Sequence, residues 1–340
     1  MSIDARRDAP ITVCPGCGNS SGENYDGNGL CWECFTARTD PAVSNGSTPK
    51  AAKAGTYSPQ EWAQAIRDGL QRDEDIAMPF PFDDLNRSMD GGLRFGEVCL
   101  VAGYTSMGKS VIVDQMADSA ARAGRRVHLY MTEMTAYQRG LRLLARRTNL
   151  SFGSLRRRYL TPEIWQQING ELDALPYGCS VVADWTVEDV CAHILENRWD
   201  VAFVDLIHGF HYQDERDLSK TSSAMVRAAK ASSTGDHPGT TIVAAAHLND
   251  GQMQGQRSPK RPKPGLHSIK GASSLKQDAD VVMFVHLEDN EDGIPTADGE
   301  VWAAKNRQGA LGSCKVRLDI RRMAFRAVTS EDGEHGKAPF

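Results

Sequence analysis

The chain has 340 residues and a hydrophobic content of 40%, which is enough for one large domain and a small additional module. No apolar run is long enough to span a membrane, and the N-terminus lacks the apolar core of a signal peptide, so we expect a cytoplasmic protein with no membrane partner. The net charge of −5 and the isoelectric point near 6.0 exclude a strongly basic protein. Binding to nucleic acid would therefore depend on local basic surfaces.

The first motif in chain order is a set of two C-x-x-C pairs, Cys14 with Cys17 and Cys31 with Cys34. Four thiolates at this spacing are typical of a structural zinc site, in which the metal has no open position for catalysis. The segment between the pairs is rich in Gly, Asn and Ser and has almost no core, so Zn²⁺ would supply its folding energy. Two disulfides are the alternative, but they are rare in cytoplasmic proteins. We predict a zinc-ribbon-like module over residues 1–37.

A linker and an amphipathic helix are expected next. Residues 38–57 are mostly small or polar, which predicts a flexible linker. Ser58, a capping residue followed by proline, then opens a segment with helical periodicity that leads into the main domain over 58–77. Its apolar residues Trp62, Ile66 and Leu70 would share one face of the helix, and this face needs a packing partner.

The most informative motif is a glycine-rich loop that matches G-x-x-x-x-G-K-[ST]. It consists of Gly103, Tyr104, Thr105, Ser106, Met107, Gly108, Lys109 and Ser110. An apolar run precedes it and a helical pattern follows it, which is the context of a loop that binds nucleotide phosphates. Backbone N–H groups and the helix N-terminus would face the phosphates, Lys109 would contact the β and γ phosphates, and the Ser110 hydroxyl would bind Mg²⁺. A glycine turn before an ordinary surface helix is the alternative, which the flanking context disfavours.

Apolar runs alternate with helical stretches over residues 78–328. The runs lie at Val98–Ala102, Val127–Met131, Ser180–Ala183, Val201–Val204, Thr241–Ala246 and Val281–Val285. This order predicts an α/β fold with a mostly parallel sheet flanked by helices. Three later segments, Val301–Lys305, Cys314–Ile320 and Met323–Val328, follow one another with turns only, and they predict antiparallel strands at one edge of the sheet. A polar tail at 329–340 completes the chain.

Several polar residues follow the predicted strands, where the carboxyl ends of parallel strands meet. Asp205 is placed to hold Mg²⁺ through water, and Glu133 is placed to orient and deprotonate an attacking water molecule. His247 would sense the γ-phosphate of a nucleotide. Lys305 and Arg307 suit contact with phosphate, and Arg307 would act as an arginine finger on a neighbouring subunit. From the residues alone, a helix-capping Asp, a helix-start Glu, a structural His and ordinary surface cations remain open alternatives.

Three local groups of basic residues are the candidates for contact with nucleic acid. They are Arg139, Arg142, Arg146 and Arg147 in one helical stretch, then Arg156, Arg157 and Arg158, and finally Arg257, Lys260, Arg261 and Lys263 in a loop rich in Pro and Gly. For each group, an ordinary solvated surface is the equal alternative.

Together these motifs resemble the RecA-like motor domain of ring-shaped replicative helicases, of the DnaB type and the phage helicase–primase type. The similarity covers about residues 78–328. Besides the phosphate loop, the matching segments are Gly91–Val98, Tyr130–Met134, Val204–Asp205, Ala246–Asn249, Ile269–Asp280 and Lys305–Gly309. The polar residue at the sensor position is Gln in most DnaB-type proteins and His in the phage type, so His247 favours the phage type.

The resemblance implies an ATP-dependent DNA helicase that binds ATP and Mg²⁺ between the subunits of a homo-oligomeric ring, expected to be a hexamer. It assigns water activation to Glu133 and places Arg307 in the site of the neighbouring subunit. It also implies movement from 5′ to 3′ on single-stranded and forked DNA, with loops such as 252–267 following the DNA backbone. The helix at 58–71 would dock on the next subunit, and a primase, polymerase or loader would be a partner.

Two other functions stay open beside this one. We expect neither the helical N-terminal domain of the DnaB type nor, within residues 38–80, a primase core. The RadA/Sms type of recombination translocase combines a zinc module, a RecA-like core and a K-N-R-x-G motif, but it normally ends in a protease-like domain for which this chain is too short. A non-motor, nucleotide-gated DNA-binding or loader protein is the second alternative, and the intact phosphate loop, Glu133 and Asp205 argue against it.

Overall fold

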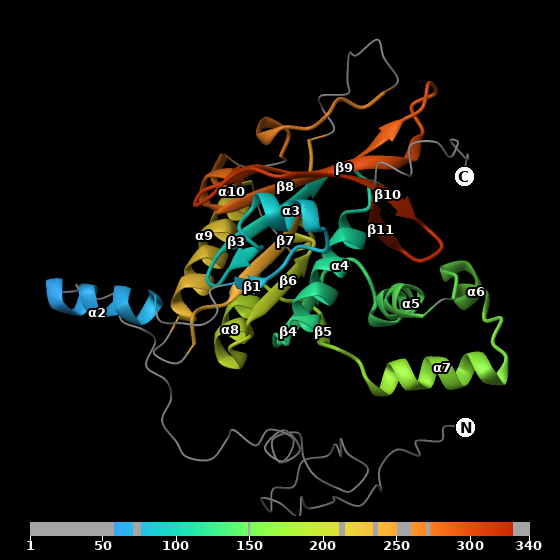
Figure 1. Cartoon of the computed structure of the whole chain (residues 1–340), viewed down its shortest axis with the longest axis horizontal. Coiled ribbons are helices and arrows are strands. Elements are labelled where there is room, and N and C mark those ends of the chain that lie inside the picture. The colour runs from blue at the N-terminus through green and yellow to red at the C-terminus, as the bar shows by residue number, and fades with distance from the viewer. Residues whose placement is uncertain are drawn as a thin grey trace, which may run out of the picture. The chain divides into compact units, whose positions relative to one another are not determined.

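The computed structural model describes residues 58–70, 76–148, 150–210, 215–233, 237–249, 260–269 and 273–328 (Figure 1). Outside these residues lie the predicted zinc module with Cys14, Cys17, Cys31 and Cys34, the linker at 38–57, Arg257 and the tail at 329–340. The chain divides into two units, Met1–Lys50 and Ala51–Phe340, and all described residues belong to the second. Within this described part, no helix is long and apolar enough to cross a membrane.

A nine-stranded sheet forms the centre of the second unit. Its strands, in spatial order, are β11 (Ala324–Ala327), β10 (Ser313–Asp319), β9 (Pro295–Asn306), β8 (Val281–Asp289), β3 (Val98–Gly103), β7 (Thr241–His247), β6 (Val201–Asp205), β4 (Val127–Met131) and β5 (Gly178–Val181). All pairs from β8 to β5 are parallel, whereas β9, β10 and β11 pair antiparallel. The predicted parallel sheet with antiparallel strands at one edge is confirmed. β9 begins before the predicted Val301 because polar residues that carry no strand pattern also pair with β8.

Helices cover both faces of this sheet (Figure 1). On one face lie α4 (Lys109–Arg122), α5 (Ala136–Arg147), α6 (Phe152–Arg157) and α7 (Pro162–Asp173), and on the other lie α8 (Val187–Asn197), α9 (Glu215–Ala231) and α10 (Ser273–Asp278). The connection from β3 to β4 and the connection from β6 to β7 run in opposite directions along the sheet. Because both crossovers are right-handed, their helices lie on opposite faces. β3, β4 and β6 are buried over their whole length, as expected for a sheet covered on both faces.

Shorter elements lie around the sheet. β1 (Ile76–Met78) and β2 (Leu93–Arg94) form a separate antiparallel pair, with α3 (Asp83–Ser88) between them in sequence, and the 3-10 turns η1 (Ile207–Gly209) and η3 (Leu266–Ser268) follow β6 and β7. The predicted amphipathic helix is present as α2 (Pro59–Leu70). Trp62, Ile66 and Leu70 on this helix are 66%, 49% and 82% exposed, so its apolar face is left in water by the single chain.

The parallel register brings predicted site residues to one edge of the sheet. Gly103, at the end of β3, is the register partner of His247 at the end of β7. Asp205, at the end of β6, is the partner of Met131 at the end of β4. β3, β7, β6 and β4 are neighbours in the sheet and run parallel, so the loops that follow them lie together at the carboxyl end of the strands. Ligands of parallel sheets bind at this end.

Two of the four arginines of α5, Arg139 and Arg146, form buried ion pairs, which corrects the expectation of a basic or solvated surface at these positions. Arg139 donates from Nε to Asp114 Oδ1 at 2.5 Å and from Nη1 to Asp205. Arg146 donates from Nε to Asp118 Oδ2 at 2.5 Å. Asp114 and Asp118 lie one turn apart on α4, so the charged faces of the two helices meet. This pair of aspartates inside an otherwise apolar helical pattern is the signal in the sequence that points to the pairing.

Two cations in the described part of the basic loop before η3, Arg261 and Lys263, form ion pairs. Arg261 forms an ion pair with Asp289 at the end of β8. Lys263 donates to Glu300 on β9 at 2.5 Å. These two contacts fix the described part of the loop to the β8–β9 hairpin. The remaining group, Arg156–Arg158, is exposed.

Candidate functional site

The phosphate loop connects β3 to α4, and close packing around its glycines fixes its curve. Gly108 has φ +82°, and a Cβ at this position would lie 2.6 Å from the ring of Phe325. A Cβ on Gly103 would lie 2.8 Å from the carbonyl oxygen of Val285. Neither position accommodates a side chain without movement of its neighbours, which explains the glycine spacing of the motif.

Lys109 is the first residue of α4 and is buried beneath the loop. Its Nζ donates to the carbonyl oxygens of Gly103 at 3.0 Å and Tyr104 at 2.9 Å. These bonds hold the ammonium group within the curve of the loop. The N-terminus of α4 adds N–H groups and the positive end of the helix dipole at the same place, so the loop has the geometry of a phosphate site.

A cavity of about 330 Å³ opens in front of this loop. Its lining consists of Thr105, Ser106, Gly108, Lys109, Ser110, Val111, Glu133, Arg142, Asp205, Leu206, His247, Leu318, Ile320 and Met323. The structure thus brings the phosphate loop together with three polar residues expected from the sequence, Glu133, Asp205 and His247. The apolar wall comes from β10 and the turn before β11, so the antiparallel edge of the sheet helps to close the cavity.

Asp205 is buried at the end of β6. Burial alone would raise the pKa of this carboxyl group, but Arg139, the Ser110 hydroxyl and Lys109 lower the pKa below its usual value. Asp205 is therefore an ionised carboxylate near neutral pH, beside the hydroxyl of Ser110. Carboxylate, hydroxyl and phosphate oxygens are the ligands that Mg²⁺ prefers, so these two residues fit a magnesium ion bound together with a nucleotide.

Glu133 and His247 lie at the mouth of the cavity, after β4 and at the end of β7. The side chain of Glu133 is 60% exposed, and its Oε1 lies 3.9 Å from Nε2 of His247. The backbone N–H of His247 donates to Nδ1 of His208 at 3.3 Å, and the two imidazole rings lie 5.7 Å apart. A carboxylate that faces water next to an imidazole has the arrangement of a general base.

Two residues of this site are not predicted from the sequence. Arg142 lines the cavity, and its Nε has no hydrogen-bond partner in the described part of the chain. In the sequence, Arg142 is one of several arginines in the same helical stretch, and only its position about two turns into the helix after Glu133 distinguishes it. His208, in η1, supports His247, and its position three residues after Asp205 is the only signal for it.

Lys305 and Arg307 lie outside this cavity, at the end of β9. Lys305 Nζ donates to three carbonyl oxygens at the C-terminal end of α10, at distances of 2.8, 2.9 and 2.6 Å, and so caps that helix. Arg307 Nη1 donates to Asp280 Oδ1 at 2.9 Å, and its side chain is 45% exposed. Within one subunit, the structure does not bring these two cations to the phosphate loop.

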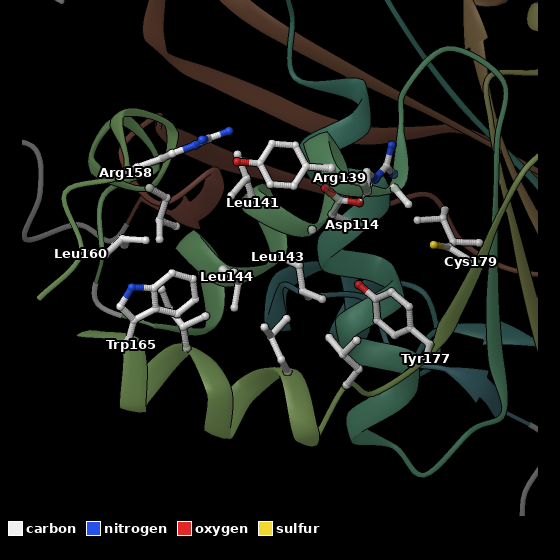
Figure 2. A pocket seen from close by; sticks show the side chains of 18 residues that line it. Asp114, Arg139, Leu141, Leu143, Leu144, Arg158, Leu160, Trp165, Tyr177 and Cys179 are labelled. Carbon is white, nitrogen blue, oxygen red and sulfur yellow. Dashed lines mark hydrogen bonds and ion pairs between the residues drawn. The ribbon is translucent and has the colours of Figure 1, made fainter. Parts of the chain in front are cut away.

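A second cavity, the α5–α7 groove, has a volume of about 590 Å³ and is mostly apolar. It lies between α5, α6 and α7, and Figure 2 shows Asp114 and Arg139 on one side of it and Trp165 on the other. Trp165, Leu172 and Leu175 line the groove and are 48%, 42% and 51% exposed. An exposed apolar groove of this size is typical of a contact site for a partner.

The fold and the site together define a class of protein. A glycine loop between a strand and a helix, with an acidic residue at the end of a nearby parallel strand, defines a P-loop nucleotide-binding protein. Residues 77–327 match the DnaB-like helicase C terminal domain, and the chain belongs to this family.

Two solved structures share the fold. A structure described as an ATPase domain has a TM-score of 0.67 and 18% sequence identity, and the match covers 81% of this chain and 100% of that chain. A DnaB-like replicative helicase, described together with its interactions with primase, has a TM-score of 0.66 and 19% identity, with 80% and 68% covered. These likenesses show that the chain has the RecA-like ATPase fold.

The chain is also similar in sequence to proteins named as replicative helicases. The replicative DNA helicase DnaB of Geobacillus stearothermophilus is 25% identical over 265 residues, which cover 72% of this chain and 55% of that protein. The replicative DNA helicase DnaC of Bacillus subtilis (strain 168) is 24% identical over 258 residues, which cover 70% and 54%. The chain therefore spans about half the length of these relatives.

The substitution Gly108→Ala tests the close packing of the phosphate loop. It places a side chain at φ +82° and against Phe325, so the loop must move. We expect the affinity for a fluorescent ADP with Mg²⁺ to fall about ten- to a hundredfold, which corresponds to strain of about 1–3 kcal/mol. Gly124→Ala is the matched control, because Gly124 has φ +77° but open space around its Cβ position. Unchanged affinity in Gly108→Ala would contradict the assignment of the loop.

Proposed function

We propose that the chain is an ATP-dependent DNA helicase that acts in replication. The observation that carries this proposal is that the phosphate loop, the Asp205 carboxylate and the water-facing Glu133 line one cavity. Such a set of groups suits the hydrolysis of a nucleoside triphosphate. Membership of the DnaB-like family and similarity to proteins named replicative DNA helicases support DNA unwinding as the work that hydrolysis drives.

The residues of the cavity would divide the chemistry between them. The N–H groups of the loop and Lys109 would bind the phosphates of ATP, while Ser110 and Asp205 would hold Mg²⁺. When bound, the ion neutralises charge on the β and γ phosphates. Glu133 accepts the proton of the attacking water. His247, with Nε2 3.9 Å from the Glu133 carboxylate, orients that carboxylate and senses the γ-phosphate.

Two further arginines would contact the nucleotide from opposite sides. Arg142 lines the cavity of its own subunit, and its Nε, which has no hydrogen-bond partner among the residues that the structure describes, suits a phosphate oxygen. Arg307 is half-exposed and lies away from its own cavity, so it would reach the γ-phosphate held by a neighbouring subunit, with Lys305 as the second cation of this contact. A site completed by the neighbour needs a head-to-tail interface, and we propose that this interface closes into a hexameric ring.

The ring would translocate on single-stranded DNA from 5′ to 3′ and unwind forked duplex. The loop at 252–267 is proposed to follow the DNA backbone. Its described end is anchored, since Arg261 pairs with Asp289 and Lys263 pairs with Glu300 on the β8–β9 hairpin. An anchored base would transmit movement of the sheet edge to the bound DNA.

The N-terminal module remains a proposal from the spacing of its four cysteines, which lie outside the described residues. Cys14, Cys17, Cys31 and Cys34 would hold Zn²⁺ in a structural site. We propose that the module touches DNA or recruits a primase, polymerase or loader. A protein with this task would lie in the cytoplasm, which is that of the host if the chain is encoded by a phage.

Unwinding of a forked DNA with a free 5′ tail tests the proposed function. The wild-type protein should unwind this substrate with ATP and Mg²⁺. Lys109→Ala should lose at least about a hundredfold in both hydrolysis and unwinding, because it removes a charge that faces the phosphates. Lys315→Ala, which changes an exposed lysine on β10, is the control and should act like the wild type.

Each deviation from this result has its own meaning. Hydrolysis retained in Lys109→Ala would overturn the nucleotide site. Hydrolysis stimulated by DNA but without unwinding would overturn the helicase assignment in favour of a RadA-like translocase. A wild-type protein that binds nucleotide and DNA but does not hydrolyse ATP would be a nucleotide-gated loader instead.

We also propose that α2 of one subunit docks in the α5–α7 groove of the next. Trp62, Ile66 and Leu70 are spaced four residues apart, so they form one exposed apolar stripe along the helix. The groove offers an exposed apolar surface to receive it, with Trp165 on its wall. An amphipathic helix laid into an apolar groove is a common mode of recognition, and it would join the subunits of a ring.

Substitution of either partner tests this docking. Trp62→Glu on α2 and Trp165→Glu in the groove should each shift the protein from ring to monomer, with a dissociation constant raised about a hundredfold, as expected for a buried aromatic anchor. Sedimentation velocity measures the distribution. Leu311→Glu is the control, because Leu311 is 57% exposed but does not line the groove. Rings that persist in both tryptophan variants would contradict the docking.

A further inference from the structure

Arg139 lies between the nucleotide cavity and the α5–α7 groove, and it bonds to a carboxylate on each side. It donates from Nε to Asp114 on α4 at 2.5 Å, and from Nη1 to Asp205 at the end of β6. The three side chains are buried, with exposed fractions of 5%, 2% and 6%. Nη2 of Arg139 has no hydrogen-bond partner among the described residues, so the two carboxylates set the orientation of the guanidinium plane.

This bridge also sets the direction of the Asp205 carboxylate. Arg139 holds Oδ2 of Asp205 from the side of α5. Ser110 lines the same cavity as Asp205, from the side of the phosphate loop, and its hydroxyl lowers the pKa of this carboxyl group. With Oδ2 held by Arg139, the carboxylate keeps one orientation in the cavity, beside Ser110, the residue that would share the magnesium ion with it.

Stability alone gives little reason for such a bridge. Removing a guanidinium and two carboxylates from water is costly, and well-packed apolar residues in their place are often equally stable. Asp114 does not line the nucleotide cavity, so its contact with the site passes through Arg139. Asp114 therefore anchors the guanidinium group of Arg139, and Arg139 in turn holds the carboxylate of Asp205 at the cavity.

We propose that Arg139, anchored by Asp114, is a positioning residue that orients Asp205 for the magnesium ion bound with the nucleotide. Groups that orient a metal ligand from behind typically change metal affinity about ten- to a hundredfold when they are removed. The proposal rests on the nucleotide site proposed above and adds to it a residue that lies outside the cavity lining.

The test measures how strongly Mg²⁺ tightens nucleotide binding, without any measurement of turnover. The affinity for a fluorescent ADP is determined once with Mg²⁺ and once with EDTA, and the ratio of the two gives the coupling. Arg139→Lys keeps the charge but loses the two-pronged contact. The double variant Asp114→Leu with Arg139→Leu removes both members of this ion pair, so that neither side chain is left as a buried charge without the other. Arg147→Gln is the control on the same helix, since the ion pair of Arg147 among the described residues is with the partly exposed Glu171.

Both bridge variants should lower the coupling about tenfold or more while the affinity in EDTA stays at the wild-type value. The control should keep the wild-type coupling. A wild-type coupling in the double variant, with only a lower melting temperature, would overturn the proposal and leave Arg139 a structural residue. A higher coupling would also overturn it, because Arg139 would then compete with the metal. Absence of nucleotide binding by the wild type in both solutions would overturn the nucleotide site itself.

Discussion

The parallel register of β3, β7, β6 and β4 is the constraint on which the candidate site depends. Hydrogen bonding between these strands aligns Gly103 with His247 and Met131 with Asp205, so residues far apart in sequence end at one edge of the sheet. A slip by one residue would turn Asp205 to the other face of the sheet and away from Ser110. The buried apolar strands fix the register, and the polar residues at their ends inherit their positions from it.

Buried charge connects the nucleotide cavity with the α5–α7 groove. Asp114 and Arg139 form a wall of the α5–α7 groove, and Arg139 is bonded to Asp205, which lines the nucleotide cavity. Removing one partner of such a buried ion pair leaves an unpaired buried charge, which destabilises the fold by about 3–5 kcal/mol. The groove and the nucleotide cavity are thus joined by a short chain of contacts that has to remain complete.

Local patterns allow the prediction of the phosphate loop, the strands and the antiparallel edge. The glycine spacing from Gly103 to Ser110 and the apolar runs each depend on a few neighbouring residues. The pairing of Arg139 is different, because its partner Asp114 lies 25 residues earlier and the contact exists only after α5 has packed on α4. The same holds for Lys305, whose bonds to the end of α10 make an apparent surface cation into a helix cap. The spacing of Asp114 and Asp118 indicates charges on one face of α4, but only the tertiary packing determines which cation each of them meets.

Each nucleotide site is proposed to be shared, with Glu133 from one subunit and Arg307 from the next. ATP hydrolysis by mixtures of Glu133→Gln and Arg307→Ala proteins tests it most directly. Each variant alone should be inactive, and an equal mixture should regain up to about a quarter of the wild-type rate, because about a quarter of the interfaces would join two intact halves. A mixture as inactive as its components, or Arg307→Ala that hydrolyses ATP at the wild-type rate, would contradict the account.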